Sequence, residues 1–92
     1  MTAYMLGHFE VGDYDSWKPM FDADPAARRE TAKGHVLARS VDSPSEVFVR
    51  VEFDSVDEAK ALRERLLASG ALDNVTVKME PTVVEVAEQV TY

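Results

Sequence analysis

The chain has 92 residues, 46% hydrophobic and 29% charged, which is ordinary for one small globular domain and too apolar for a disordered chain. Seventeen acidic against ten basic residues give a net charge of −7, which repels nucleic-acid phosphates and anionic lipid headgroups. The absence of cysteine excludes disulfides and thiolate metal sites. We therefore expect one domain over residues 1–92, with neither nucleic acid nor membrane as a partner.

The N-terminal segment predicts a cytoplasmic protein. It carries no basic leader, and its alternating pattern is typical of a strand rather than of a signal peptide. No apolar run in the chain approaches the roughly 20 residues that a membrane-spanning helix requires.

The first third of the chain predicts a strand followed by a helix. Residues 4–11 alternate with the two-residue period of a strand. After a break at the next two residues, Trp17 and Phe21 belong to an apolar series at three- and four-residue steps, which indicates a helix. The dipeptide Asp24-Pro25 is typical of a new N-cap followed by proline, so we expect this helix to be kinked or split there.

The middle of the chain predicts a hairpin. Residues 35–41 and 46–54 have strand patterns, and the turn residues 42–45 connect them. The second of these strands carries one fully apolar face, which predicts a central position in the sheet. That face consists of Val47, Val49, Val51 and Phe53.

The last third predicts a second helix, a fourth strand and an extended tail. A capping box over residues 55–58 begins the helix, and Gly70 ends it. Residues 75–79 form a strand that Pro81 should end, after which residues 82–90 form a further extended run.

The resulting β-α-β-β-α-β order predicts an α+β, ferredoxin-like domain with a C-terminal strand extension. Two right-handed β-α-β halves place both helices on one face of an antiparallel sheet and leave the other face bare. Both faces of the first strand carry large apolar residues, so we expect a second copy to cover the bare face and form a dimeric α/β barrel. The tail should pair with the partner's sheet, because its valines would otherwise make an exposed edge; the alternative is that it folds back onto its own sheet.

Three segments carry a resemblance to a known group of proteins. They are DYDSWKPMFD (residues 13–22), RSVDSPSEV (residues 39–47) and EFDS with the following EA (residues 52–59). The pattern resembles small bacterial proteins of the dimeric α/β-barrel superfamily, which includes antibiotic biosynthesis monooxygenases and proteins labelled polyketide cyclases. The resemblance implies a ligand cavity between helices and sheet. Some members oxidise aromatic polyketides without metal or flavin, whereas others bind haem or have no known activity.

The candidate catalytic residues are His35 and His8, the two imidazoles of the chain, because imidazole transfers protons near neutral pH. The alternative is that both are structural or surface residues. A metal site would require both histidines to meet Glu10, but the first two strands are separated by the third in this topology, so we expect no metal.

The candidate ligand-binding residues form an apolar pocket with cationic anchors. Trp17 and Phe21 are either a pocket wall or ordinary core. Arg39 or Arg50 is an anchor for a carboxylate or phenolate. The alternative is a buried structural ion pair of Arg50 with Glu52 or with Glu10 on the neighbouring first strand. The full set is Phe9, Trp17, Phe21, Arg39, Val49, Arg50, Leu62 and Leu66.

The chain contains no phosphate-binding glycine loop, no nucleophile–base signature and no zinc-binding helix motif, so we expect no cofactor. With the resemblance, this predicts a cofactor-independent monooxygenase or cyclase, which acts on an aromatic, polyketide-like small molecule. The alternative is a non-catalytic dimeric module for ligand binding or stress response.

Overall fold

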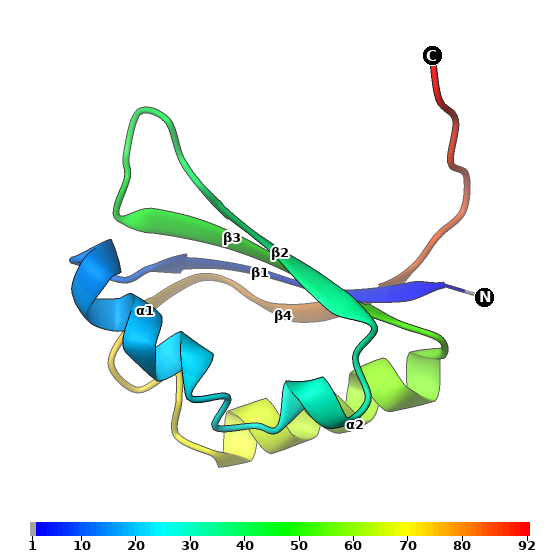
Figure 1. Ribbon diagram of the computed structural model, residues 1–92, viewed down its shortest axis with the longest axis horizontal. Helices are drawn as coiled ribbons and strands as arrows, with labels where there is room; N and C mark the ends of the chain where they lie inside the picture. The colour runs from blue at the N-terminus through cyan, green and yellow to red at the C-terminus, as the bar shows by residue number, and fades with distance from the viewer. Residues whose placement is uncertain (1) are drawn as a thin grey trace.

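The computed structural model describes residues 2–92 and has a ferredoxin-like α+β architecture (Figure 1). Its elements are β1 (Ala3–Glu10), α1 (Tyr14–Asp22), the short 3-10 helix η1 (Arg28–Glu30), β2 (Gly34–Arg39), β3 (Glu46–Phe53), α2 (Val56–Ala68) and β4 (Thr76–Glu85). The four strands form one antiparallel sheet in the order β2-β3-β1-β4, and both helices lie on the same face. The predicted fold class is confirmed.

The core lies between the two central strands and the helices. On β1 the alternate residues Met5 and Phe9 are buried, and β3 buries the whole predicted stripe from Val47 to Phe53 on the same face. Leu62 from α2 completes this layer and is 2% exposed. The predicted apolar face of β3 is therefore confirmed, and the structure decides between the two faces of β1, which the sequence left open. A register shift of one residue would expose every one of these side chains.

The first helix ends before Asp24, as the sequence predicts, but no second α-helix follows. Asp24 has a left-handed backbone with φ of 57°, and its carboxylate accepts hydrogen bonds from the N–H groups of Arg28 and Arg29. It therefore caps the short η1 turn instead of a new helix. Pro19 lies in the second turn of α1, although proline is best tolerated in the first turn of a helix. The next turn still closes, because the N–H of Ala23 bonds to the Pro19 carbonyl.

The second helix has the predicted ends. The Ser55 hydroxyl accepts a hydrogen bond from the N–H of Glu58 at 3.2 Å, which satisfies one of the free donors of the first turn. After the helix, Gly70 has φ of 75°, a backbone conformation that residues with a Cβ atom rarely adopt. None of the helices within residues 2–92 is long and apolar enough to cross a membrane.

The last strand corrects two expectations. Pro81 does not end it: β4 runs through Pro81 to Glu85, and the shift in register places Gly7 of β1 opposite two residues, a β-bulge. An edge strand tolerates proline at a bulge, because the sheet ladder needs no N–H donor at that position. The expectation that residues 82–90 pair with a partner is wrong for residues 82–85, which pair with the chain's own β1. The N–H of Val86 still bonds to the Thr2 carbonyl at 3.2 Å, and after it the chain leaves the sheet (Figure 1).

Candidate functional site

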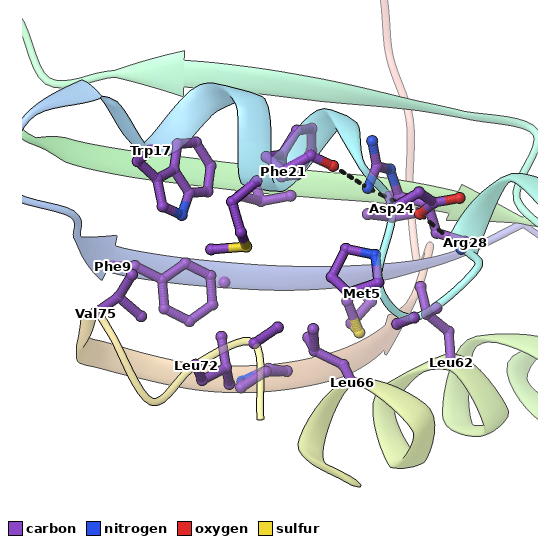
Figure 2. A pocket seen from close by; sticks show the side chains of 18 residues that line it. Met5, Phe9, Trp17, Phe21, Asp24, Arg28, Leu62, Leu66, Leu72 and Val75 are labelled. Atoms are coloured by element: carbon purple, nitrogen blue, oxygen red, sulfur yellow. Dashed lines mark hydrogen bonds and ion pairs between the residues drawn. The ribbon is translucent and has the colours of Figure 1, made fainter. Parts of the chain in front are cut away.

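A cavity of about 80 Å³ lies between the two helices and the helix-facing side of the sheet. One water molecule needs roughly 10–15 Å³ of such space, so the cavity is several times larger than a packing defect. Figure 2 shows side chains from β1, α1, α2 and the loop before β4 converging on it. Nearly all of them are apolar, as is typical of pockets for small organic molecules.

One wall of the cavity is aromatic and comes from α1. The Trp17 and Phe21 rings are four residues apart and therefore lie on the same side of the helix, with their centroids 5.2 Å apart. Both rings are half-buried and pack at the margin of the core, and α1 has no fully buried residue. Helix α1 therefore contacts the core through only a few partly buried side chains.

The opposite wall depends on a glycine in β1. A Cβ atom at Gly7 would lie 2.6 Å from the Phe9 ring, a distance that real Cβ atoms essentially never show. The absence of a side chain at Gly7 therefore lets the Phe9 ring lie back against the strand. An alanine here would push the ring away from this position.

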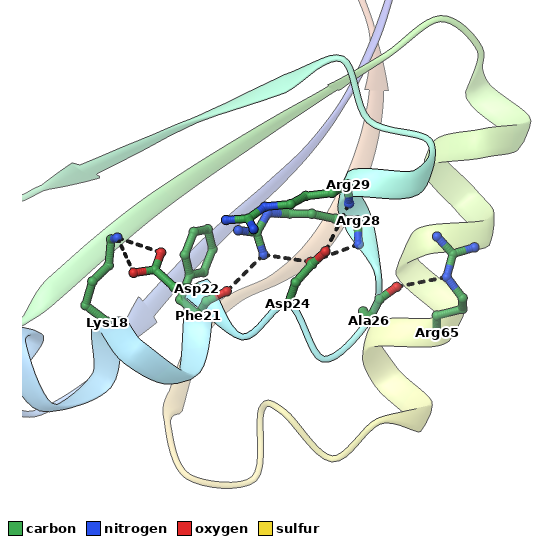
Figure 3. A network of polar contacts seen from close by, with 8 residues as sticks. All are labelled: Lys18, Phe21, Asp22, Asp24, Ala26, Arg28, Arg29 and Arg65. Carbon is green, nitrogen blue, oxygen red and sulfur yellow. Dashed lines mark hydrogen bonds and ion pairs between the residues drawn. The ribbon is translucent and has the colours of Figure 1, made fainter.

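The polar side of the cavity consists of Asp24 and Arg28 (Figure 3). The Arg28 guanidinium lies 3.9 Å from the Phe21 ring centre, and its Nη1 donates to Asp24 Oδ1 at 3.0 Å and to the Phe21 carbonyl at 3.1 Å. Burial raises the pKa of Asp24, but the N–H groups of Arg29 and Arg28 and the charge of Arg28 outweigh it and hold that pKa below its usual value. Asp24 is therefore ionised and a weak base.

Six of the eight predicted ligand-binding residues line this cavity. They are Phe9, Trp17, Phe21, Val49, Leu62 and Leu66. The two predicted anchors lie elsewhere: the Arg39 guanidinium stacks on Tyr14 at 4.5 Å, and that of Arg50 on Tyr4 at 4.9 Å. Both arginines are exposed, so neither needs the buried ion pair considered above, and no such pair with Glu52 occurs within residues 2–92.

The structure does not bring the two histidines together. His8 lies on the open face, stacked on Phe48 with Nε2 3.0 Å from the Glu46 carboxylate. His35 lies on the helix side, with its ring edge-on to Phe21 at 5.2 Å, and neither histidine lines the cavity. Partial desolvation against the helix side, followed by the charges of Arg28, Arg29 and Lys18, lowers the pKa of His35 below its usual value, although the residue is exposed overall. Within residues 2–92 no three potential metal ligands cluster.

Arg28, Asp24 and Gly7 are the site residues that the sequence interpretation missed. Arg28 had one signal, since it continues the helical spacing of Trp17 and Phe21 by seven residues. Its charge hides that signal, because arginine is almost never fully buried unless it is paired.

No protein-family model matches the chain, and no curated protein matches it in sequence. Solved structures do match it over nearly its whole length. A candidate antibiotic biosynthesis monooxygenase from Chloroflexus aurantiacus aligns with a TM-score of 0.65 and 10% identity, covering 99% of this chain and 98% of that one. A candidate from Bordetella bronchiseptica aligns with a TM-score of 0.63 and 17% identity, covering 97% of this chain and 98% of that one. Another from Deinococcus radiodurans aligns with a TM-score of 0.62 and 16% identity, covering 100% of this chain and 98% of that one.

The chain has the fold of these proteins. The predicted resemblance is therefore confirmed for the architecture, from the first strand to the last residues. At 10–17% identity the likeness concerns the backbone arrangement, and one such fold serves several chemistries.

Proposed function

We propose that the cavity binds a small aromatic molecule and that the protein catalyses its cofactor-independent oxygenation or cyclisation. The observation that carries the proposal is the apolar cavity itself, with the Trp17–Phe21 wall on one side and Arg28 as its cationic edge. The solved structures named as candidate antibiotic biosynthesis monooxygenases support the same reading.

The residues of the cavity restrict the chemistry. The ionisable residues that line it are Asp24 and Arg28, and Asp24 is a weak base. The substrate must therefore be acidic enough to ionise with little help, as a phenol-substituted anthrone is. Its carbanion reacts with molecular oxygen at a ring CH₂, which becomes a carbonyl, while the second oxygen atom leaves as water. A dry pocket favours this route because water cannot reprotonate the carbanion.

Substrate size sets a further requirement. A cavity of about 80 Å³ is smaller than a polycyclic aromatic molecule needs, so its walls must move to admit one. One of these walls, α1, has no fully buried residue. Segments with few buried contacts open at the lowest free-energy cost, so we place the entrance at α1.

Gly7→Ala should reduce oxygen uptake with a dihydroxyanthrone by at least about tenfold. The new methyl group displaces the Phe9 ring into the cavity, and overpacking of this kind typically costs about 1–3 kcal/mol. Gly34→Ala is the matched control, because a Cβ there meets no atom within 4 Å. Oxygen electrode measurements on metal-free protein decide the matter. If wild-type uptake does not exceed the protein-free rate, the catalytic proposal is wrong.

The weak basicity of the cavity also favours the second candidate, a binding module without turnover. The two readings differ in one measurement. Saturable quenching of Trp17, the single tryptophan, by an aromatic ligand without oxygen uptake or cyclised product would support the module.

The open face of the sheet supports the proposal of a homodimer. Phe48, Val36 and Met79 on this face are 44%, 48% and 39% exposed, so three large apolar residues meet water there. A second copy of the same face would cover them through a symmetric contact.

Phe48→Asp should raise the dimer dissociation constant by at least about 30-fold, the effect of losing one interface hot spot of 2 kcal/mol. Val41→Asp is the control, since Val41 lies in the β2–β3 connection and is 93% exposed. Sedimentation velocity distinguishes the two states. A wild-type protein that sediments as a monomer at all concentrations would overturn the dimer.

A further inference from the structure

Arg28 is a buried cation, and two of its three guanidinium nitrogens have no hydrogen-bond partner. Its exposed fraction is 7%, and among residues 2–92 it is the one charged residue that is buried. Nη1 donates to the Asp24 carboxylate and to the Phe21 carbonyl, whereas Nε and Nη2 are buried and have no acceptor. Buried polar groups are nearly always hydrogen-bonded, so two free donors on one side chain indicate a missing partner.

Asp24 does not bind these two donors, because its oxygens are turned to other N–H groups. Oδ1 accepts from the backbone N–H of Arg28 at 2.9 Å as well as from Nη1, and Oδ2 accepts from the N–H of Arg29 at 3.1 Å. These bonds hold the η1 turn against α1 (Figure 3). The carboxylate thus binds the guanidinium of Arg28 through Nη1 only and leaves the edge formed by Nε and Nη2 open.

The open edge has the geometry of a carboxylate receptor. Nε–H and Nη2–H point the same way from one side of the planar group, and two such parallel donors match the two oxygens of a carboxylate. Arg28 lines the cavity, and its guanidinium covers the Phe21 ring, which also lines it (Figure 2). Apart from Asp24, the remaining lining residues carry no charge.

We propose that Arg28 binds the anionic group of the cavity's ligand, so that the ligand class is an aromatic carboxylate or phenolate whose ring packs on Trp17 and Phe21. This inference rests on the proposed ligand-binding function and specifies its substrate class. The anion takes Nε and Nη2 of Arg28, and the aromatic ring fills the apolar part of the cavity. A neutral amide of equal shape would offer these two donors one acceptor oxygen and no negative charge.

The test compares benzoate with benzamide, two single-ring molecules that differ in charge and hardly in shape. The indole N–H resonance of Trp17, the single tryptophan of the wall, reports binding by NMR titration. We expect benzoate to bind at least about tenfold tighter than benzamide. Arg28→Met should abolish this preference, and Arg28→Lys should retain only part of it, because lysine keeps the charge without the two-donor edge.

The control is Arg29→Met, which removes the same charge one residue away on an exposed side chain and keeps the backbone N–H that Asp24 binds. It should preserve the preference for benzoate. Equal binding of both molecules to wild type overturns the anion-binding role and leaves the pocket intact. A preference that survives in folded Arg28→Lys at full strength also overturns it. Binding of neither molecule overturns the pocket as a site for aromatic ligands, and with it both proposals.

Discussion

Phe53→Ala should lower the free energy of unfolding by about 3–5 kcal/mol, the usual loss for a buried phenylalanine. Phe53 is fully buried on β3, opposite Ala3 in the register with β1, and belongs to the core cluster under α2. The substitution removes its transfer free energy and leaves a hole that β3, paired on both sides, cannot close. Small domains have about 5–15 kcal/mol of stability in total, so the variant should be close to unfolding at 37 °C.

The matched control for this experiment is Phe48→Ala on the same strand. Phe48 points to the open face and is 44% exposed, so its truncation should cost the isolated chain less than about 1 kcal/mol. Any further loss at Phe48 should depend on protein concentration, since it arises from association, whereas the loss at Phe53 should not. Urea denaturation at two protein concentrations measures both. Equal losses in the two variants would mean that the assignment of the buried face of β3 is wrong.

Deletion of residues 82–92 should prevent stable folding, whereas deletion of residues 87–92 should leave the fold intact. The longer deletion removes Val83 and Val84, which pair with Met5 and Tyr4, and breaks the outer half of the β1–β4 ladder. The two valines are half-buried, so each contributes less than the roughly 1.5–3 kcal/mol of a fully buried side chain, but together with the lost ladder bonds they form a large share of the total stability. In the shorter deletion, the residues removed are exposed, Val90 by 57% and Tyr92 completely.

Circular dichroism and thermal melts of the two truncated chains check this expectation. The chain without residues 87–92 should melt within a few degrees of the full chain at low concentration. If its melting temperature falls as far as that of the longer deletion, the terminal residues have a structural role that the isolated chain does not explain. A change confined to the sedimentation profile would instead place these residues in the dimer contact.

The sequence by itself determined the element order, the buried face of β3 and the ends of α2, whereas the buried face of β1 was left open. These features depend on neighbouring residues: strand alternation on β1 and β3, the Ser55–Glu58 capping pair, and the left-handed conformation that Gly70 allows. Local periodicity also identified most of the apolar cavity wall, since Trp17 and Phe21 follow helical spacing. Propensity and pattern are reliable for such local features because the interactions that produce them lie within a few residues.

Only the tertiary structure decided which arginine lines the cavity and where the last strand ends. Arg28 is buried because the loop after α1 folds back and lays its guanidinium on Phe21, with Asp24 capping the turn, and no local pattern specifies that approach. Arg39 and Arg50 looked equally suitable in sequence, but in the structure both are exposed and lie on the rings of Tyr14 and Tyr4, outside the cavity. Pro81 predicts the end of a strand, but the bulge opposite Gly7 accommodates it within β4. The sequence could not show this bulge, because the two strands that form it lie more than 70 residues apart in the chain.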